Sequence, residues 1–93
     1  MTRRERERLI CQRVTRRIGE VAPEGIGRWD PAWEIVAPPS DAFLDVLDAW
    51  LNDDSPDTRA ALQAAADDLV RAWREAGRRY QEARQGQGRE VPA

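Results

Sequence analysis

Histidine and lysine are absent from the 93-residue chain, and Cys11 is its only cysteine. Without histidine, the chain itself contains no His-based catalytic triad, no histidine metal site and no imidazole pH switch. A single cysteine excludes an intrachain disulfide and a CxxC zinc or redox site. We therefore expect the protein to work without a metal and without a cofactor.

Long apolar runs are also missing. Within residues 1–20 the only adjacent apolar pair is Leu9–Ile10, whereas a secretory signal needs an apolar run of about 7–15 residues. No run of about 18 apolar residues occurs anywhere, which is the length that a membrane-spanning helix requires. These absences predict a cytoplasmic protein that has no membrane partner.

Charged residues are abundant and unevenly distributed. The chain holds 15 Arg against 17 Asp and Glu, for a net charge of −2. Residues 1–20 contain seven Arg and three Glu (net +4), whereas residues 29–58 contain eight acidic residues and no Arg (net −8). The complete use of Arg in place of Lys is typical of GC-rich coding. We therefore predict an origin in a GC-rich bacterium, one of its phages or another mobile element.

The length and the apolar pattern predict an all-α protein, a small three-helix bundle. A chain of this size forms one core that buries about 60–65% of the surface exposed by the unfolded chain. The expected helices span about 3–19, 41–52 and 56–85. They form a single helical domain of residues 1–85, and residues 86–93 are expected to form a flexible C-terminal tail.

Capping residues and glycines define the expected helix ends. Gly19 lies close to the position of a C-terminal cap in the first helix. Ser40 is predicted to cap the second helix and Ser55, which precedes a proline, the third. Gly86 and Gly88 are expected to end the third helix.

The connector of residues 22–40 contains four prolines and two glycines, which oppose a long helix. Asp30–Pro31 is a favourable helix start, so residues 31–36 are expected to form one short helical turn. Pro38 is expected to hold Ala37 in an extended conformation. A connector of this length without regular structure is uncommon, so it is either functional or packed as a compact loop.

The third predicted helix has the most regular apolar pattern. Its apolar seam recurs every 3.5 residues and comprises Leu62, Ala66, Leu69, Trp73, Ala76, Tyr80 and Ala83. Such a seam suits packing along another helix, and it predicts a homo-oligomer formed through this helix. At 1.5 Å per residue this helix would be about 43 Å long and the second about 17 Å. Because the second helix cannot cover the third, we expect Trp29, Trp33, Ile35 and Val36 to close one end of the core.

The candidate partner-binding residues are Trp29, Trp33, Asp41, Asp45 and Asp48. The two tryptophans either complete the core or present a docking surface, since indoles are enriched at the energetic centres of interfaces. The three aspartates share one face of the second predicted helix. That face is either a docking surface for a basic partner, a partial mimic of nucleic-acid phosphate, or an ordinary solvated surface.

The alternative candidates, for nucleic-acid binding, are Arg6, Arg13, Arg16 and Arg17 in the first predicted helix. Basic side chains along one helix can grip phosphates. Interleaved glutamates, the acidic net charge and the lack of a recognition motif favour instead a solvated surface. These arginines could equally pair with the acidic face of the second helix, where each exposed pair would contribute about 0–1 kcal/mol.

Catalysis has little support in this sequence. Ser40 and Ser55 are explained as helix caps, and Cys11 lies among apolar residues, where a thiol behaves as a small hydrophobic group. We therefore predict a non-enzymatic module that binds another protein, as an accessory subunit, an adaptor or a small inhibitor. The alternative is a small nucleic-acid-binding regulator.

Overall fold

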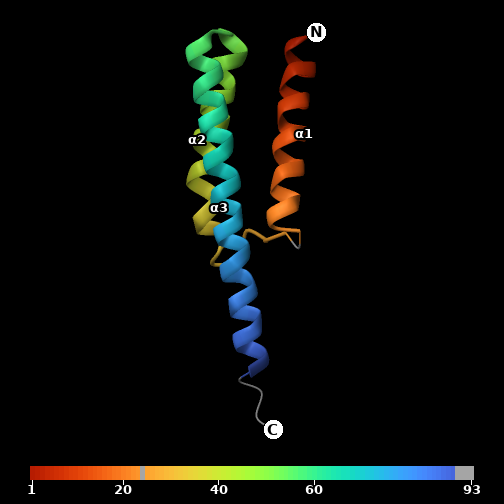
Figure 1. Ribbon diagram of the computed structural model, residues 1–93, viewed down its shortest axis with the longest axis vertical. Coiled ribbons are helices and arrows are strands. Elements are labelled where there is room, and N and C mark those ends of the chain that lie inside the picture. Colours follow the sequence, from red (N-terminus) through yellow and green to blue (C-terminus); the bar gives the residue numbers. More distant parts are fainter. Residues whose placement is uncertain (24, 90–93) are drawn as a thin grey trace.

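The computed structural model describes residues 1–23 and 25–89 and contains three α-helices in this part of the chain. They are α1 (Arg3–Val21), α2 (Trp33–Asn52) and α3 (Pro56–Arg89), and the described residues form no strand (Figure 1). The prediction of an all-α three-helix bundle is therefore confirmed. The molecule is elongated, measuring 60 × 19 × 19 Å, because α3 continues well past the other two helices.

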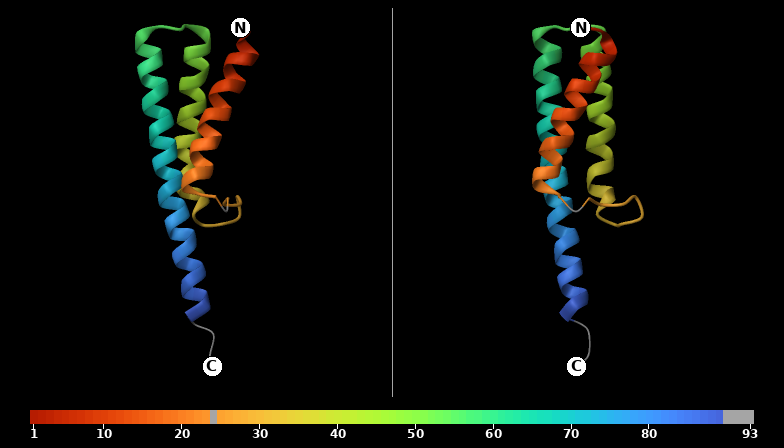
Figure 2. Two further views of the ribbon diagram at one scale, coloured as in Figure 1. Left: turned by 45° about the vertical axis from the view of Figure 1, so that its right-hand side comes forward. Right: turned by 90° about the vertical axis from the view of Figure 1, so that its right-hand side faces the viewer.

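The helices run alternately up and down. A short turn at residues 53–55 joins α2 and α3 into an antiparallel hairpin, and α1 lies beside that hairpin (Figure 1). The left view of Figure 2 shows α1 inclined to the hairpin, close to α3 at its C-terminal end and diverging toward its N-terminus. This divergence leaves α1 less covered than the other two helices.

Local hydrogen bonds define both ends of α1. The Thr2 hydroxyl accepts a hydrogen bond from the Glu5 backbone N–H at 3.2 Å, which makes Thr2 the N-terminal cap. At the other end the helix passes through Gly19 to Val21, and the Ala22 N–H donates to the Ile18 carbonyl at 2.8 Å. The predicted end at Gly19 was therefore two residues too early.

Helix α2 begins eight residues earlier than predicted, at Trp33 rather than Asp41. The Asp30 carboxylate accepts a hydrogen bond from the Ala32 N–H at 2.8 Å, but the N-terminal cap of α2 is Ala32, so the predicted cap at Asp30 was wrong. Of the predicted helical turn at 31–36, residues 33–36 form the beginning of a longer helix and residues 31–32 form a turn before it. Ser40 is inside this helix, so its prediction as the cap was wrong.

Two prolines lie inside α2, and the predicted extended conformation of Ala37 was wrong. An interior proline removes a hydrogen-bond donor and crowds the carbonyl of the preceding turn, which costs about 3 kcal/mol. The same stretch buries Val36 completely and packs Trp33 and Ile35 against α3. A fully buried side chain such as Val36 contributes roughly 1.5–3 kcal/mol, so this packing offsets part of the cost of the prolines.

Helix α3 begins as the sequence predicts and ends later. Ser55 caps it through reciprocal bonds, since the Thr58 N–H donates to the Ser55 hydroxyl (3.2 Å) and the Ser55 N–H donates to the Thr58 hydroxyl (2.9 Å). The helix then runs through Gly86 and Gly88 to Arg89, so the predicted end at residue 85 was wrong. Residues 90–93 of the predicted tail lie outside the described residues, and the flexibility of the tail stays a prediction.

The core consists of two clusters along α3. In the first, all three helices contribute buried side chains: Val14, Phe43, Leu47, Leu62, Ala66 and Leu69. In the second, the connector and α2 cover α3 through Ile26, Ala32, Val36 and Ala76. The connector therefore closes one end of the core, as expected.

The two connector-end tryptophans have different surroundings. The Trp33 ring meets the Trp73 ring edge to face, with centroids 5.8 Å apart and an interplanar angle of 82°. Trp29 instead is 90% exposed. The expectation that Trp29 completes the core was wrong, whereas Trp33, Ile35 and Val36 do pack there.

The 3.5-residue seam of α3 is used within the chain. Its members from Leu62 to Tyr80 pack against α1, α2 or the connector, whereas Ala83 is exposed. Only the distal end of the seam therefore remains for a second copy, and a homo-oligomer through α3 stays a prediction.

Gly77 marks the place where the end of α1 approaches α3. A Cβ atom there would lie 3.3 Å from the Val21 carbonyl oxygen and 3.5 Å from the Ala22 Cβ. We expect Gly77→Leu to lower the free energy of unfolding by about 1–3 kcal/mol, because the added carbons must displace backbone. Gly19→Leu is the matched control, since nothing lies within 4 Å of that position.

The Gly19→Leu control should raise the free energy of unfolding by about 0.5–1 kcal/mol through helix propensity alone. Urea denaturation of both variants measures the contrast. A Gly77→Leu variant as stable as Gly19→Leu would show that α1 does not rest on α3 at this point.

Candidate functional site

The three predicted aspartates lie together on the outer face of α2, and all are exposed. The Asp48 carboxylate accepts hydrogen bonds from Arg3 (2.8 Å) and Asn52 (3.4 Å). Asp41 and Asp45 form no ion pair within the described part of the chain. Two carboxylates of this face are therefore available to a partner, and the third already holds the N-terminus of α1 to α2.

Trp29 projects from the turn that precedes α2. The indole lies close to the backbone of Gly27, where an added Cβ would meet the ring and displace it. The Trp29 side chain is 90% exposed, so most of the ring faces solvent.

Trp33 lies one turn further on and is half-buried. The Trp73 ring packs against it, and the Arg28 guanidinium lies 5.9 Å from its centroid. The structure therefore gives the two predicted tryptophans separate environments: most of the Trp33 ring belongs to the core, and the Trp29 ring belongs to the surface.

The arginines of α1 are partly engaged within the molecule. The Arg6 guanidinium lies 4.4 Å from the centroid of the Trp50 ring and 3.6 Å from the Asp54 carboxylate. Arg17 donates to the Asp67 carboxylate of α3 at 2.8 Å. Two of the four predicted arginines therefore pair with acidic residues, but these lie in α3 and in the α2–α3 turn. The acidic face of α2 is instead contacted by Arg3, through Asp48.

The other two predicted nucleic-acid-binding residues, Arg13 and Arg16, are exposed. Within the described part of the chain neither has an ion-pair partner. They lie on different sides of α1, because Arg13 borders a hollow facing α3 and Arg16 borders one on the outer side of α1. The structure therefore does not gather the four arginines into one continuous patch.

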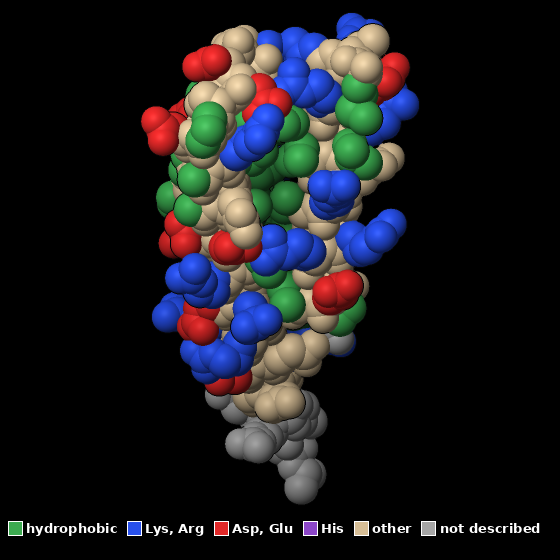
Figure 3. Space-filling view, turned by 45° about the horizontal axis from the view of Figure 1, so that its top comes forward, with side chains coloured by type: hydrophobic (Ala, Val, Ile, Leu, Met, Phe, Trp, Pro, Cys, Tyr) green, Lys and Arg blue, Asp and Glu red, His purple; other side chains and the backbone are tan. Residues whose placement is uncertain are grey.

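A groove of about 340 Å³ separates α1 from α3. Figure 3 shows a hollow with hydrophobic side chains in its depth and basic side chains along its edges. The groove is lined by Ile10, Arg13, Val14, Arg17, Trp50, Arg59, Leu62, Gln63 and Ala66. Sequence reasoning identified the apolar and basic residues of α1 but missed the groove, because the divergence of α1 from the hairpin is a tertiary property.

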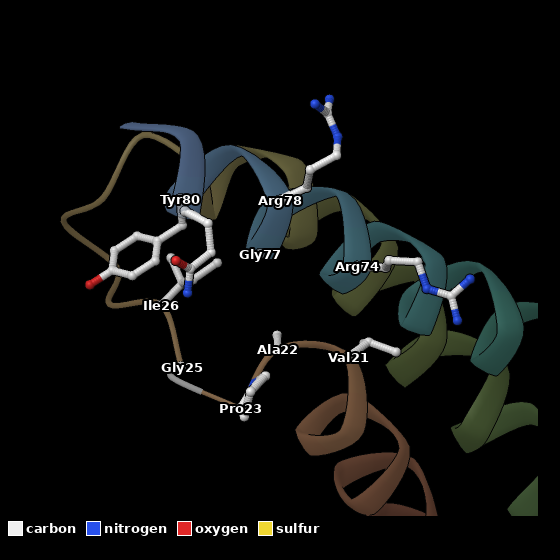
Figure 4. Close-up of a pocket in the computed structure, with 10 residues that line it drawn as sticks. Val21, Ala22, Pro23, Gly25, Ile26, Arg74, Gly77, Arg78 and Tyr80 are labelled. Carbon is white, nitrogen blue, oxygen red and sulfur yellow. The ribbon is translucent and has the colours of Figure 1, made fainter. Parts of the chain in front are cut away.

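A second cavity, of about 350 Å³, lies between the connector and the distal part of α3. Val21, Ala22, Pro23 and Ile26 form its apolar side, and Figure 4 shows the Arg78 side chain turned away from them. The Arg78 guanidinium donates to Glu75, and together with Arg79 it holds the pKa of that carboxyl at about 2. The titratable side chains among the described residues that line this cavity are those of Arg74, Arg78 and Tyr80.

Cys11 is half-buried on α1. Burial, and then the nearby Glu7 carboxylate, raise the pKa of its thiol. A raised pKa keeps the thiol protonated at neutral pH, and the thiolate is the nucleophilic form. The surroundings of Cys11 thus resemble those of a structural cysteine.

Comparison with protein-family models, with curated proteins and with solved structures found no match to this chain. Among the described residues, no group of three or more Cys, Asp or Glu side chains is arranged to hold a metal ion. None of the described helices combines the length and the apolar character needed to cross a bilayer.

Proposed function

We propose that this protein is a non-enzymatic protein-interaction module of the bacterial or phage-infected cytoplasm, acting as an accessory subunit, an adaptor or a small inhibitor. The observation that carries the proposal is the Trp29 indole, which is 90% exposed beside Gly27. An indole offers a large contact area at a low entropic cost. Exposure of this indole adds no core packing that would stabilise the fold.

The acidic face of α2 defines the chemistry of the partner. Asp41 and Asp45 are exposed and without ion pairs in the described part of the chain. Leu44, at 56% exposure, lies between them in sequence and adds an apolar contact. A partner that fits would offer a pocket for the indole and basic side chains for the carboxylates.

Affinity capture from the native host, followed by mass spectrometry and reconstitution with the purified partner, tests this proposal. Trp29→Ala should weaken partner binding by at least tenfold, as expected for an interface centre. The Asp41→Arg, Asp45→Arg double variant should also weaken it. Glu7→Arg, an exposed charge reversal on α1, is the matched control and should bind normally.

Circular dichroism should show all these variants folded, because each changed side chain is exposed. Unchanged partner binding by folded Trp29→Ala and by the double aspartate variant would overturn the proposal.

Exposed Arg13 and Arg16 support the second candidate function, nucleic-acid binding. A salt titration against duplex and single-stranded DNA tests it. Steeply salt-dependent affinity that is lost on Arg→Ala at positions 13, 16 and 17 would favour this function. Absence of binding at low salt would remove it.

A further inference from the structure

We infer that the groove between α1 and α3 is a docking site for an acidic amphipathic helix of a partner protein. This site is separate from Trp29 and from the acidic face of α2, and the inference stands without the function proposed above. It follows from three features of the groove: an incompletely covered apolar floor, basic edges and a length of about two helical turns.

The floor of the groove is apolar and only partly covered. Of the apolar residues that line it, Val14, Leu62 and Ala66 are buried, but Ile10 of α1 is only half-buried. Trp50 of α2 reaches the same groove and is also half-buried. A further helix placed along the opening would complete the burial of these side chains, as a fourth helix does in a four-helix bundle.

The edges of the groove are basic. Arg13 and Arg17 stand on the α1 side and Arg59 on the α3 side. Asp67 is bound to Arg17 at 2.8 Å, and Asp54 is bound to Arg59 at 2.6 Å. Each nearby carboxylate is thus already paired, and the groove keeps an excess of positive charge.

Arg13 carries this excess most directly. Its side chain is exposed and has no ion pair within the described part of the chain. Gln63, on the opposite edge, is also exposed and is uncharged. A helix with acidic residues flanking its apolar face would therefore be attracted by Arg13 on one edge and would not be repelled by Gln63 on the other.

The dimensions fit a short helix face. Ile10 and Arg17 mark the two ends of the groove along α1, and the seven residues from one to the other rise about 10 Å, or two turns. The Arg17–Asp67 ion pair joins α1 to α3 and forms one end of the groove. A volume of about 340 Å³ admits the apolar side chains of a helix rather than its backbone. The occupant thus contributes apolar residues at i, i+3, i+4 and i+7.

A second copy of the chain fits this site less well. Its own acidic surface, the outer face of α2, offers Leu44 as its exposed large apolar side chain. Residues 74–86 of α3 hold four Arg against two Glu, and this net positive charge would meet like charge at the groove. Neither surface combines acidic charge with an apolar row.

Two synthetic 18-residue peptides test the inference. Both carry Leu at the helical i, i+3, i+4 and i+7 spacing, and the remaining positions are mostly Glu in one and mostly Lys in the other. Fluorescence anisotropy with the full chain at low salt should show the Glu peptide binding at least tenfold more tightly. High salt should reduce the difference in affinity between the two peptides, because ions screen exposed charges.

Matched variants locate the peptide. Arg13→Glu and Gln63→Glu, on opposite edges of the groove, should each weaken the Glu peptide about threefold to tenfold through lost attraction or new repulsion. Arg8→Glu makes the same charge change on the outer side of α1 and should leave binding unchanged. Amide and Trp50 indole shifts in NMR spectra should map the peptide to α1 and α3.

Three results would overturn the inference: equal or tighter binding of the Lys peptide, equal loss of binding in the Arg8→Glu and Arg13→Glu variants, or concentration-dependent dimers that Arg13→Glu dissociates. Nucleic acid that displaces the Glu peptide at equimolar concentration would also count against it. The Trp29→Ala variant should bind the Glu peptide as tightly as the parent chain does. The peptide experiment therefore tests the groove independently of the function proposed for the Trp29 surface.

Discussion

Replacing Phe43 with alanine is expected to lower the free energy of unfolding by about 3–5 kcal/mol. The Phe43 side chain is 4% exposed and belongs to the cluster in which α1, α2 and α3 all meet. Its removal costs the transfer free energy of the ring and leaves a cavity that the surrounding helices fill only in part. No other phenylalanine is present in the chain to compensate.

The expected loss is a large share of the roughly 5–15 kcal/mol that stabilises a typical domain. Thermal unfolding followed by circular dichroism should show a fall in melting temperature of about 15–35 °C, on the scaling for domains of this size. Leu44→Ala is the matched control, because Leu44 neighbours Phe43 in α2 but is 56% exposed. That control should change stability by less than about 0.5 kcal/mol. Equal effects of the two substitutions would contradict the assignment of α2's inner face.

Replacing Pro38 with alanine is expected to raise the free energy of unfolding by about 1–3 kcal/mol. Pro38 lies more than one turn inside α2, where its ring removes an N–H donor and crowds the Glu34 carbonyl. Its side chain is exposed, so the substitution removes no core contact. The alanine variant gains unfolded-state entropy worth about 0.4–1 kcal/mol, which offsets part of the gain.

Pro31→Ala is the matched control for this prediction. Pro31 precedes the first residue of α2 and is exposed, so its ring interrupts no bond of the helix interior. Alanine there should lower stability by about 0.4–1 kcal/mol through the unfolded state. Urea denaturation measures the free energy of unfolding of both variants. A Pro38→Ala variant that is less stable than the parent would show that residues 33–40 are not helical in solution.

The two proposed surfaces differ in how the fold produces them. The Trp29 surface depends on a local turn, in which the Asp30 carboxylate holds the Ala32 N–H and Gly27 makes room for the indole. The groove depends on the position of α1, which leans on α3 near Gly77 and diverges at its other end. A change at Gly77 should therefore alter the groove and leave the surroundings of Trp29 intact.

By itself, the sequence determined the features that depend on neighbouring residues. The helical class, the cap at Ser55 and the common face of Asp41, Asp45 and Asp48 all follow from periodicity and capping within one or two turns. Such local interactions need no knowledge of the remaining chain.

Only the tertiary structure decided the start of α2, the separation of Trp29 from Trp33 and the groove between α1 and α3. These features depend on packing between segments distant in sequence, such as Trp33 against Trp73 and Val36 in one cluster with Ala76. That packing opposes the local cost of two interior prolines, which sequence patterns count as helix breakers.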